Sequence, residues 1–567
     1  MTKEEKLNSP VKGFRLMLGY TGLFLIFIGI ITFIPLFVLL FYPSNGYAWW
    51  FFYIPSFLSV LIGGILFIPI KNRPFGNLTY LENATLIVFV WVVAILVSAL
   101  PYYIWGHVGG PNAPVFSNVK GIIEIGSTFL PGGKEHIYHS FSNCVFESVS
   151  GFSSTGLTLF PTTLYPAGTY NYNFGLFQYK TGGYTEFLPN CEIFFFHRAI
   201  MTFTGGIGLV LILSSAINKR SSFQLYLLEG HNDKLLPNLL KSARNIIYIY
   251  VFFFLFGTIF YCILGVSVLD AICYSMAGIS TGGFTSHATS ISFFSIALGG
   301  VRGRLIEAVT ILVMFFGMLP FIIHHFIYTK QFKKVFLHYE TFVFFGIVAL
   351  FLPFFIFGFS QKFSSIDASF RHGIFEFTSF ISTTGFASID GYSIQNLNSI
   401  LFFSMIIVTI IGGFTGSTAG GIKLYRLGDV FISLKETFST SIALPEEMRV
   451  IKVYKFGEKR IVTNDELKRS IDYILLYLLC VFVAVVILIF NGFQADNSIF
   501  EVCSAFSGLG ETTGLSLFAA TNHKYSAIWT LIVSMFLGRL EIQIVFIFFF
   551  RLFKHIQNEK NIYKPQE

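Results

Sequence analysis

Long apolar stretches, separated by short polar connections, run along almost the whole of this 567-residue chain. A helix that crosses a bilayer needs about 20 consecutive residues that are mostly apolar. Ten stretches meet this condition, and we expect each to span a membrane: 16–41, 50–70, 84–105, 192–217, 246–268, 305–328, 341–359, 399–422, 471–491 and 526–552. Ten spans place both ends of the chain on the same side. The first stretch is too long for a signal-peptide core, so we expect it to be retained as a helix.

Composition and charge agree with a polytopic membrane protein. Only 12% of the residues are charged and 54% are hydrophobic, whereas soluble domains usually carry roughly 25% charged residues. Basic connections gather on one side, which we predict to be cytoplasmic together with both termini. They hold Lys71, Arg73, Lys219, Arg220, Lys234, Lys241, Arg244, Lys330, Lys333, Lys334 and the basic stretch 423–469. This asymmetry explains most of the net charge of +8, so no nucleic-acid partner is expected.

Four short segments centred on glycine recur between the apolar stretches, at Gly156, Gly283, Gly385 and Gly510. In three of them, Phe-Glu precedes the glycine by ten and nine residues, and Ser precedes it by six. The second copy lacks Phe-Glu, but its Thr-Gly-Gly-Phe ending is close to the Thr-Thr-Gly-Phe of the third. Copies that recur at intervals of roughly a hundred residues indicate an internal repeat.

Each glycine segment follows a short apolar stretch of about ten residues, which is too short to cross a bilayer and predicts a re-entrant half-helix. Irregular backbone at membrane depth is tolerated where it is buried in protein or lines a watery path. Glycine permits backbone angles that a side chain forbids, and rings of carbonyl oxygens replace the water shell of a cation. The alternative is a set of ordinary glycine turns or small-residue helix contacts, which recurrence at four equivalent positions disfavours.

The sequence therefore predicts a cation filter built from four segments around one axis. Its expected ion-binding residues are Ser154, Thr155, Gly156, Thr281, Gly282, Gly283, Thr383, Thr384, Gly385, Gly508, Leu509 and Gly510. The transported ion is the substrate, and we expect this chain to bind no cofactor. The histidines, including His107, His324 and His325, show no metal-ligand spacing, and no catalytic constellation predicts an enzyme.

Several motifs resemble the Trk/Ktr/HKT superfamily of potassium transporters, and in particular its Trk branch, over about residues 17–555. Besides the glycine segments, they are Arg198–Gly208, Phe370-Arg371-His372, Gly412–Lys423 and Leu537–Glu541. The resemblance implies an all-α integral membrane fold of four pseudo-symmetric helix, pore-helix, filter-loop and helix repeats around a central pore. It implies an N-terminal two-helix extension over 1–82, repeats over 83–220, 243–330, 340–430 and 471–555, and a cytoplasmic hairpin over 431–470.

By resemblance, the segment Gly412–Lys423 is an intramembrane loop that gates the pore below the filter. Its glycines also predict a break in the helix, since each interior glycine costs about 1 kcal/mol relative to Ala. The expected gating residues are Gly416, Ser417, Gly420, Gly421, Lys423 and Arg539. A charge such as Arg539 inside an apolar stretch is functional or paired by default; resemblance places it in the pore, and a buried ion pair is the alternative. Lys423 and Arg426 act either in gating or as flanking charges.

The implied function is potassium uptake, because all four central positions are glycine and sodium-selective members of the superfamily carry serine in the first. Potassium symport with sodium or protons, a weakly selective sodium and potassium pathway, and a lipid-modifying membrane enzyme are the alternatives. The resemblance also implies a homodimer in the inner membrane and a separate cytoplasmic ring of regulatory subunits with nucleotide-binding domains.

Two features depart from the family pattern. Glu511 follows the fourth filter glycine where an apolar residue is usual. It either attracts cations to the outer mouth or turns away into a structural pair. The segment 158–189 is long and rich in Tyr and Gly, which predicts an insertion at the outer face. Of the six cysteines, Cys144 and Cys191 are the two that can meet there, and their pairing is left open.

Overall fold

The computed structural model describes residues 11–74, 76, 78–108, 137–160, 191–208, 239–287, 289–389, 397–442, 452–540 and 542–550, together with four two-residue strands between 165 and 185. The described chain is almost entirely helical, which confirms the predicted all-α membrane fold. Most of the expected outer insertion, the connection 209–238 and both termini lie outside the described residues.

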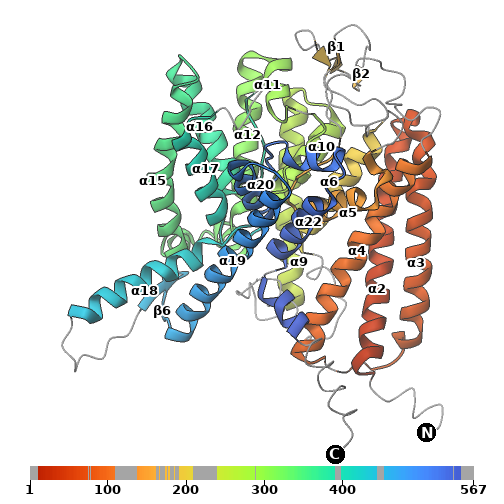
Figure 1. The fold of residues 1–567 in the computed structure, drawn as a ribbon, viewed down its shortest axis with the longest axis horizontal. Helices are drawn as coiled ribbons and strands as arrows, with labels where there is room; N and C mark the ends of the chain where they lie inside the picture. Colours follow the sequence, from red (N-terminus) through yellow and green to blue (C-terminus); the bar gives the residue numbers. More distant parts are fainter. Residues whose placement is uncertain are drawn as a thin grey trace, which may run out of the picture.

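An antiparallel helical hairpin stands at one side of the molecule (Figure 1). It consists of α2 (Gly13–Phe33), α3 (Trp49–Lys71) and the short 3-10 turns η1 (Ile34–Leu40) and η2 (Pro43–Ala48) between them. Glycines let the two helices touch, because a Cβ on Gly22 would lie 2.7 Å from the carbonyl oxygen of Gly63. The hairpin packs on α4 (Tyr80–Val108).

A long helix begins each of four successive units of the chain. They are α4, α9 (Leu239–Leu264), α15 (Tyr339–Ser360) and α19 (Asn464–Phe490). Each contains a stretch long and apolar enough to cross a membrane, as does each arm of the N-terminal hairpin. A reciprocal capping box between Thr463 and Glu466 fixes the start of α19, since it satisfies two otherwise unpaired N–H groups.

Each of these long helices is followed by a shorter one that ends in the interior. The short helices are α5 (Phe141–Phe152), α10 (Val268–Ile279), α16 (Ile366–Ile381) and α20 (Ala495–Ser507). They have 12, 12, 16 and 13 residues, so at 1.5 Å per residue none reaches across a hydrocarbon layer about 30 Å thick. The short helices have the length and position expected of the predicted half-helices.

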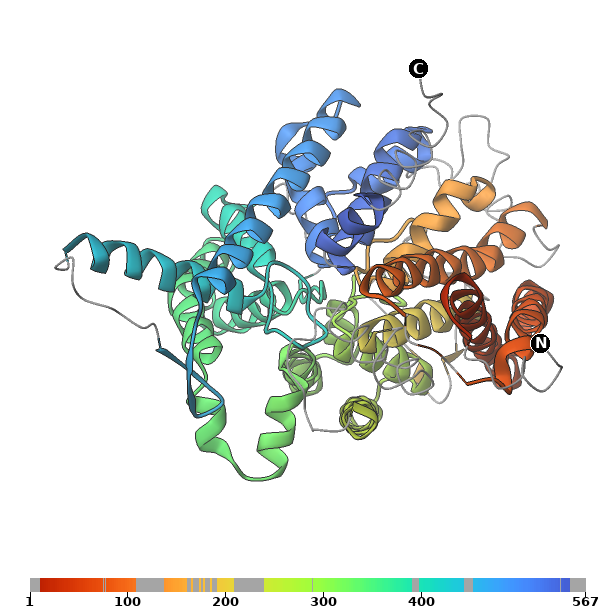
Figure 2. The ribbon, with the colours of Figure 1, turned by 90° about the horizontal axis from the view of Figure 1, so that it is seen from below.

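A third set of helices completes the pattern, and all four end within the molecule. They are α6 (Glu192–Ile207), α12 (Gly300–Met318), α17 (Ser399–Ile411) and α22 (Tyr525–Arg539). Each packs against the half-helix of the next unit: α6 on α10, α12 on α16, α17 on α20 and α22 on α5. The last contact closes the ring, and in Figure 2 the chain colours run round the centre in the same order.

The stretches 305–328 and 526–552, each expected to be one span, are sharply bent. The chain turns by 107° between α12 and α13 (Phe321–Tyr328), and by 104° between α22 and the helix Ile542–Phe550. Pro320 explains the first turn, because proline disfavours helical geometry in the preceding residue, and Leu319 is extended with ψ 142°. The break predicted in 399–422 is present, since α17 ends at Ile411.

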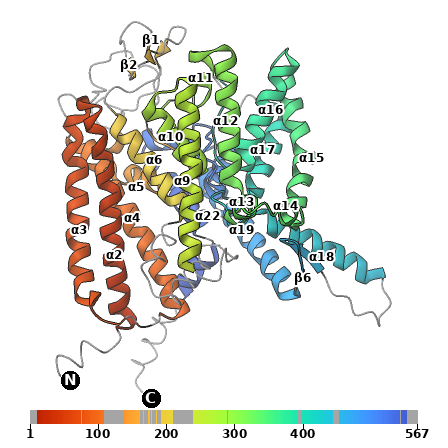
Figure 3. The ribbon, with the colours of Figure 1, turned by 180° about the vertical axis from the view of Figure 1, so that it is seen from behind.

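Smaller elements mark the two ends of the molecule. Two small antiparallel strand pairs lie at one end: β1 (Tyr165–Pro166) with β4 (Tyr184–Thr185), and β2 (Asn173–Phe174) with β3 (Phe177–Gln178). The chain also forms three further short helices, η3 (Ile137–His139), α11 (Ser292–Leu298) and α21 (Leu515–Thr521). At the opposite end, α18 (Leu424–Ile442) projects sideways beside the antiparallel pair β5 (Lys452–Lys455) and β6 (Glu458–Ile461). Figure 3 shows α13 and α14 (Phe332–Phe336) at that same end.

Candidate ion-conducting site

The four predicted filter segments meet around one centre. A Cβ atom added to Gly156 would lie 2.4 Å from the carbonyl oxygen of Gly282, in the next segment. An added Cβ would likewise lie 1.9 Å from the Thr384 carbonyl oxygen at Gly283, 2.0 Å from that of Leu509 at Gly385, and 2.1 Å from that of Thr155 at Gly510. The fourth segment thus returns to the first. A side chain larger than hydrogen fits at none of these positions.

Backbone conformation repeats in all four segments. The central glycines have positive φ, at 89°, 59°, 78° and 86° in chain order. Two residues earlier, Ser154, Thr281, Thr383 and Gly508 also have positive φ, at 54°, 50°, 54° and 74°. A non-glycine residue in this region costs about 1–2 kcal/mol and persists where the surroundings over-determine it. Three of these four residues are not glycine and yet have the same positive φ, so their surroundings impose the conformation.

Identical hydrogen bonds tie each segment to the carboxyl end of its half-helix. The N–H groups of Thr155, Gly282, Thr384 and Leu509 each donate to the carbonyl oxygen five residues earlier, at 2.8–3.0 Å. A serine precedes each central glycine by three residues, at 153, 280, 382 and 507, and all four serines are buried. This serine is present in all four copies of the sequence, yet it was absent from the predicted set.

The loop Gly412–Lys423 lies directly against the ends of three half-helices. The N–H of Gly420 donates to the hydroxyl of Thr383 at 2.7 Å. The Thr418 hydroxyl donates to the carbonyl oxygens of Ile279 and Gly317 at 3.0 Å and 2.8 Å. A Cβ on Gly420 would lie 1.8 Å from the carbonyl oxygen of Ser507. The loop therefore occupies the space beneath the second, third and fourth segments.

Other residues expected in gating hold the loop in shape. The Ser417 hydroxyl donates to the carbonyl oxygen of Phe414 at 2.6 Å, and Gly416 and Gly421 have φ of 71° and 78°. The Lys423 ammonium donates back to the carbonyl oxygen of Ala419, within the loop. The neighbouring Arg426 is buried, with its guanidinium 3.5 Å from the ring centroid of Tyr473. Arg426 is thus embedded in protein and Lys423 is half-buried, and their part in gating stays a prediction.

Arg539 lies where α22 ends, and its guanidinium joins three elements. It donates to the carbonyl oxygens of Gly205 and Gly206 at the end of α6, the latter at 3.1 Å, and to that of Thr418 in the loop at 3.3 Å. The last carbonyls of a helix have no partner within it. A guanidinium, with five donors in a planar fork, suits this position.

Comparison with known proteins shows to which family the chain belongs. Residues 119–560 match the protein-family model described as TrkH, cation transport protein. The chain belongs to the TrkH family. Relatives include the uncharacterized cation transporter MJ1485 of Methanocaldococcus jannaschii, 26% identical over 535 residues and 93% of each chain. The Trk system potassium uptake protein TrkG of Escherichia coli is 24% identical over 530 residues, covering 91% of this chain and 93% of the relative.

A solved structure gives the same fold for the TrkH-family chain. The crystal structure of the potassium transporter TrkH from Vibrio parahaemolyticus superposes with a TM-score of 0.72. The match covers 94% of this chain and 98% of that one, at 21% sequence identity. The chain is therefore a Trk-type multi-pass membrane subunit.

A buried carboxylate anchors the chain as it leaves each of the four segments, and in three of them it is the glutamate of the Phe-Glu pair. Glu147 accepts hydrogen bonds from the Thr158 hydroxyl and the Leu159 N–H at 2.8 Å and 3.0 Å. Glu376 accepts two from Ser388, at 2.8 Å and 2.9 Å. In the second unit, Asp270 accepts one from the Ser286 hydroxyl at 2.6 Å. The sequence revealed the pair, but no role for it was predicted, because the donors are 11 or more residues away along the chain.

Glu501 is the most heavily hydrogen-bonded of these anchors. It accepts hydrogen bonds from the Thr512 and Thr513 hydroxyls and from the N–H groups of Thr513 and Ser516. Each carboxylate oxygen accepts from a backbone N–H group. In a glutamine, one of these oxygens is replaced by an NH2 group, which is itself a donor and would face a backbone N–H without an acceptor between them.

We therefore expect Glu501→Gln to loosen the fourth segment. An unsatisfied buried polar group costs about 1–3 kcal/mol, so the thermal midpoint of the purified protein should fall and discrimination between cations should weaken. Glu192→Gln is the control, because Glu192 is a buried carboxylate that accepts from the Asn45 amide at 2.8 Å and Gln keeps an acceptor oxygen. Equal thermal midpoints for Glu501→Gln and the parent would contradict the anchoring role.

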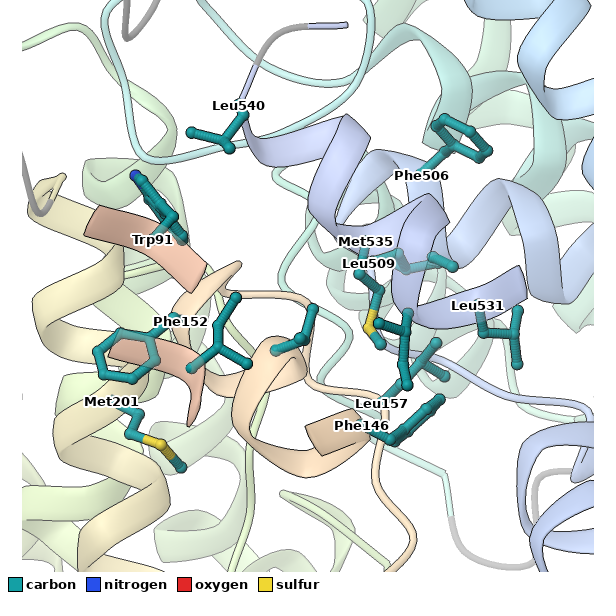
Figure 4. Close-up of a cluster of buried hydrophobic side chains, with 14 of the residues drawn as sticks. Trp91, Phe146, Phe152, Leu157, Met201, Phe506, Leu509, Leu531, Met535 and Leu540 are labelled. Carbon is teal, nitrogen blue, oxygen red and sulfur yellow. The ribbon is translucent and has the colours of Figure 1, made fainter. Parts of the chain in front are cut away.

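Apolar side chains pack behind the first and fourth segments (Figure 4). Leu157 and Leu509 are fully buried, with Leu531 and Met535 of α22 close by. The carbonyl oxygen of the predicted filter residue Leu509 faces Gly385 of the neighbouring segment, while its side chain is packed in protein. Below these two segments is a cavity of about 60 Å³, lined by Ser154, Gly508, Thr418, Lys423 and Arg539 among others. That volume is several times the roughly 10–15 Å³ that a cavity needs to hold one water molecule.

Two ion pairs hold further charges within the bundle, one buried and one with a partly exposed arginine. Arg198 of α6 lies 3.1 Å from Glu147, and its guanidinium is 4.1 Å from the ring centroid of Phe284, directly after a filter glycine. Glu307 of α12 accepts from Arg371 of α16 at 2.5 Å and 2.6 Å. Each pair joins a helix of the third set, α6 or α12, to a half-helix, so both pairs help to hold the half-helices in place.

The remaining predicted positions are placed as follows. The Glu511 backbone carbonyl accepts from the Ser504 hydroxyl at 2.6 Å, while its carboxylate has no hydrogen bond or ion pair with any residue that the structure describes. In the structure, Cys144 and Cys191 are both buried free thiols rather than a pair. Within the described ranges, no group of three or more His, Cys, Asp or Glu side chains is arranged to hold a metal ion.

Proposed function

We propose that this chain conducts potassium ions across the cell membrane through the four glycine-centred segments. The observation that carries the proposal is the closed ring of contacts between each central glycine and a carbonyl oxygen of the next segment. A backbone whose φ alternates in sign can turn successive carbonyls to the same side. Carbonyl oxygens around one axis replace the hydration shell of a cation as it passes.

Potassium is favoured over sodium by two observations. All four central residues are glycine, and curated relatives from Escherichia coli and Halomonas elongata are named potassium uptake proteins. The ion-binding set is then the twelve residues predicted above, with Leu509 contributing through its backbone. The carboxylate of Glu511 has no partner among the described residues, which supports the outer-mouth alternative over a structural pair. It is also the feature that favours the second candidate, a weakly selective potassium and sodium pathway.

We propose that the loop Gly412–Lys423 and Arg539 form the gate. The loop fills the space under three segments, and the positive charge of Arg539 lines the cavity under the first and fourth. An ion leaving the filter must displace this loop or pass the cation. The conformation described here therefore supports a closed pathway that opens when the loop moves.

The proposed orientation places both termini and the end that carries α14, β5 and β6 in the cytoplasm, because that end holds Lys330, Lys333 and Lys334. A cell inner-membrane location, a homodimer and a cytoplasmic ring of nucleotide-binding regulatory subunits follow from the family resemblance and are proposed on that ground alone. Coupling of potassium to sodium or protons would require a second ion site.

Ion flux into liposomes tests the proposal. We expect the purified protein to pass potassium and rubidium well above sodium when a membrane voltage drives them, without any co-ion, and protein-free liposomes to pass none. Equal sodium flux would overturn the potassium assignment and point to Glu511. Flux that appears only with added sodium or a proton gradient would favour symport.

A further inference from the structure

The start of α15 links the intramembrane loop to the cytoplasmic hairpin. Glu340, in the first turn of α15, is 3% exposed. One of its carboxylate oxygens accepts a hydrogen bond from the backbone N–H of Thr415, in the loop, at 3.0 Å. A charge-assisted bond of this kind is among the stronger hydrogen bonds in proteins. Glu340 therefore ties the loop to the start of α15.

The other oxygen of Glu340 lies 3.5 Å from Nε2 of His338. The His338 side chain is fully buried, and neither ring nitrogen hydrogen-bonds to a residue in the described part of the chain. Its ring is instead covered by Phe456, with centroids 4.2 Å apart and planes inclined by 20°. The position of His338 thus depends on a stacking contact and on its carboxylate neighbour.

Phe456 belongs to the tip of the β5–β6 hairpin. It occupies the two-residue turn with Gly457, between the paired residues Lys455 and Glu458. Both turn residues have positive φ, at 50° and 85°, as in the tight turns that suit the twist of a hairpin. For a bulky residue such as Phe456 this conformation is an outlier, which persists where contacts over-determine it.

A backbone hydrogen bond seats the same tip. The N–H of Gly457 donates to the carbonyl oxygen of Leu337 at 2.9 Å, one residue before His338. The hairpin tip therefore holds the residues ahead of α15 by a stacked ring and a hydrogen bond together. Figure 3 shows β6 beside the end of the bundle where α14 leads into α15.

We propose that Glu340 is a positioning residue for the intramembrane loop, and that the hairpin tip sets Glu340 through His338. Displacing the hairpin removes Phe456 from His338, frees Glu340 to move, and weakens its bond to Thr415. The hairpin is then the element through which a cytoplasmic event reaches the loop. This inference rests on the proposed role of the loop as the gate.

Amide hydrogen exchange of the loop tests the linkage without reference to transport. The full-length protein in lipid nanodiscs would be compared with Glu340→Ala and Phe456→Ala, and exchange followed by mass spectrometry in peptides that cover 412–423. We expect both substitutions to raise exchange there by about tenfold or more, since a charge-assisted hydrogen bond is among the stronger ones in proteins. Unchanged exchange in Glu340→Ala would overturn the anchoring role, and unchanged exchange in Phe456→Ala alone would overturn the link to the hairpin.

Matched variants separate this linkage from general loosening. Tyr454→Ala removes an aromatic ring from the same hairpin, where it is 41% exposed, and should leave loop exchange unchanged. Phe456→Tyr keeps the stacked ring and should restore the exchange of the parent. The double variant Glu340→Ala with Phe456→Ala should exchange no faster than Glu340→Ala alone, because both act on one contact; additive effects would contradict a serial linkage.

Ion flux through the same variants separates this inference from the function on which it rests. Faster loop exchange together with raised rubidium flux supports both. Faster exchange in a protein that conducts potassium at the level of the parent would leave the linkage standing and overturn the gating role of the loop. Slower or unchanged exchange with raised flux would overturn the linkage while the conducting function stands.

Discussion

Replacing Gly385 with alanine should abolish the discrimination of potassium from sodium and reduce potassium flux roughly tenfold or more. Gly385 has a φ of 78°, a conformation that costs a non-glycine residue about 1–2 kcal/mol. The new methyl group would also lie 2.0 Å from the carbonyl oxygen of Leu509, so that carbonyl must move. The measurement is the ratio of rubidium to sodium uptake into liposomes under a fixed voltage.

Gly346→Ala is the matched control for this prediction. Gly346 is an exposed residue within α15, and a Cβ there meets no atom within 4 Å. Alanine is also the better helix former, so this variant should keep both the flux and the selectivity of the parent. A Gly385→Ala protein that folds normally and retains the selectivity of the parent would contradict a carbonyl-lined filter at this position.

The repeats were visible in the sequence because their chemistry is local. Each copy needs a glycine with positive φ a few residues after its half-helix, as at Gly156 and Gly385, so the signal recurs in one short stretch of sequence. The same holds for the break after Ile411, where successive glycines disfavour a helix over a short span. Pro320 is an equally local indication of the turn after α12. The apolar residues on both sides of it nevertheless favoured one continuous span.

The partners of the site were not predictable in the same way, because they are far apart in the chain. Thr418 meets Ile279 and Gly317, more than 100 residues away in each case. Arg539 meets the end of α6 across more than 330 residues. The glutamates of the Phe-Glu pairs were seen as a pattern, but only the fold shows which N–H groups they accept from. The boundaries of the repeats remain predictions, since several fall outside the described residues.

Removing the charge of Arg539 should raise potassium flux several-fold. Its guanidinium lines the cavity beneath the filter, where a fixed positive charge opposes a leaving cation, and it also ties Thr418 of the loop to the end of α6. Arg539→Ala removes both effects. The measurement is rubidium uptake into liposomes at a fixed voltage, with Arg304→Ala as the control, because Arg304 belongs to an exposed ion pair with Asp367 and such pairs contribute about 0–1 kcal/mol.

Arg539→Lys distinguishes the two effects of this residue. Lysine keeps the positive charge but lacks the planar fork that reaches several carbonyls at once. If the electrostatic barrier dominates, Arg539→Lys should conduct like the parent; if the tie between α6 and the loop dominates, it should conduct like Arg539→Ala. Reduced flux in a well-folded Arg539→Ala protein would contradict both and would make Arg539 a support for the open pathway. The lysine variant therefore decides whether Arg539 limits flux through its positive charge or through its hydrogen bonds between α6 and the loop.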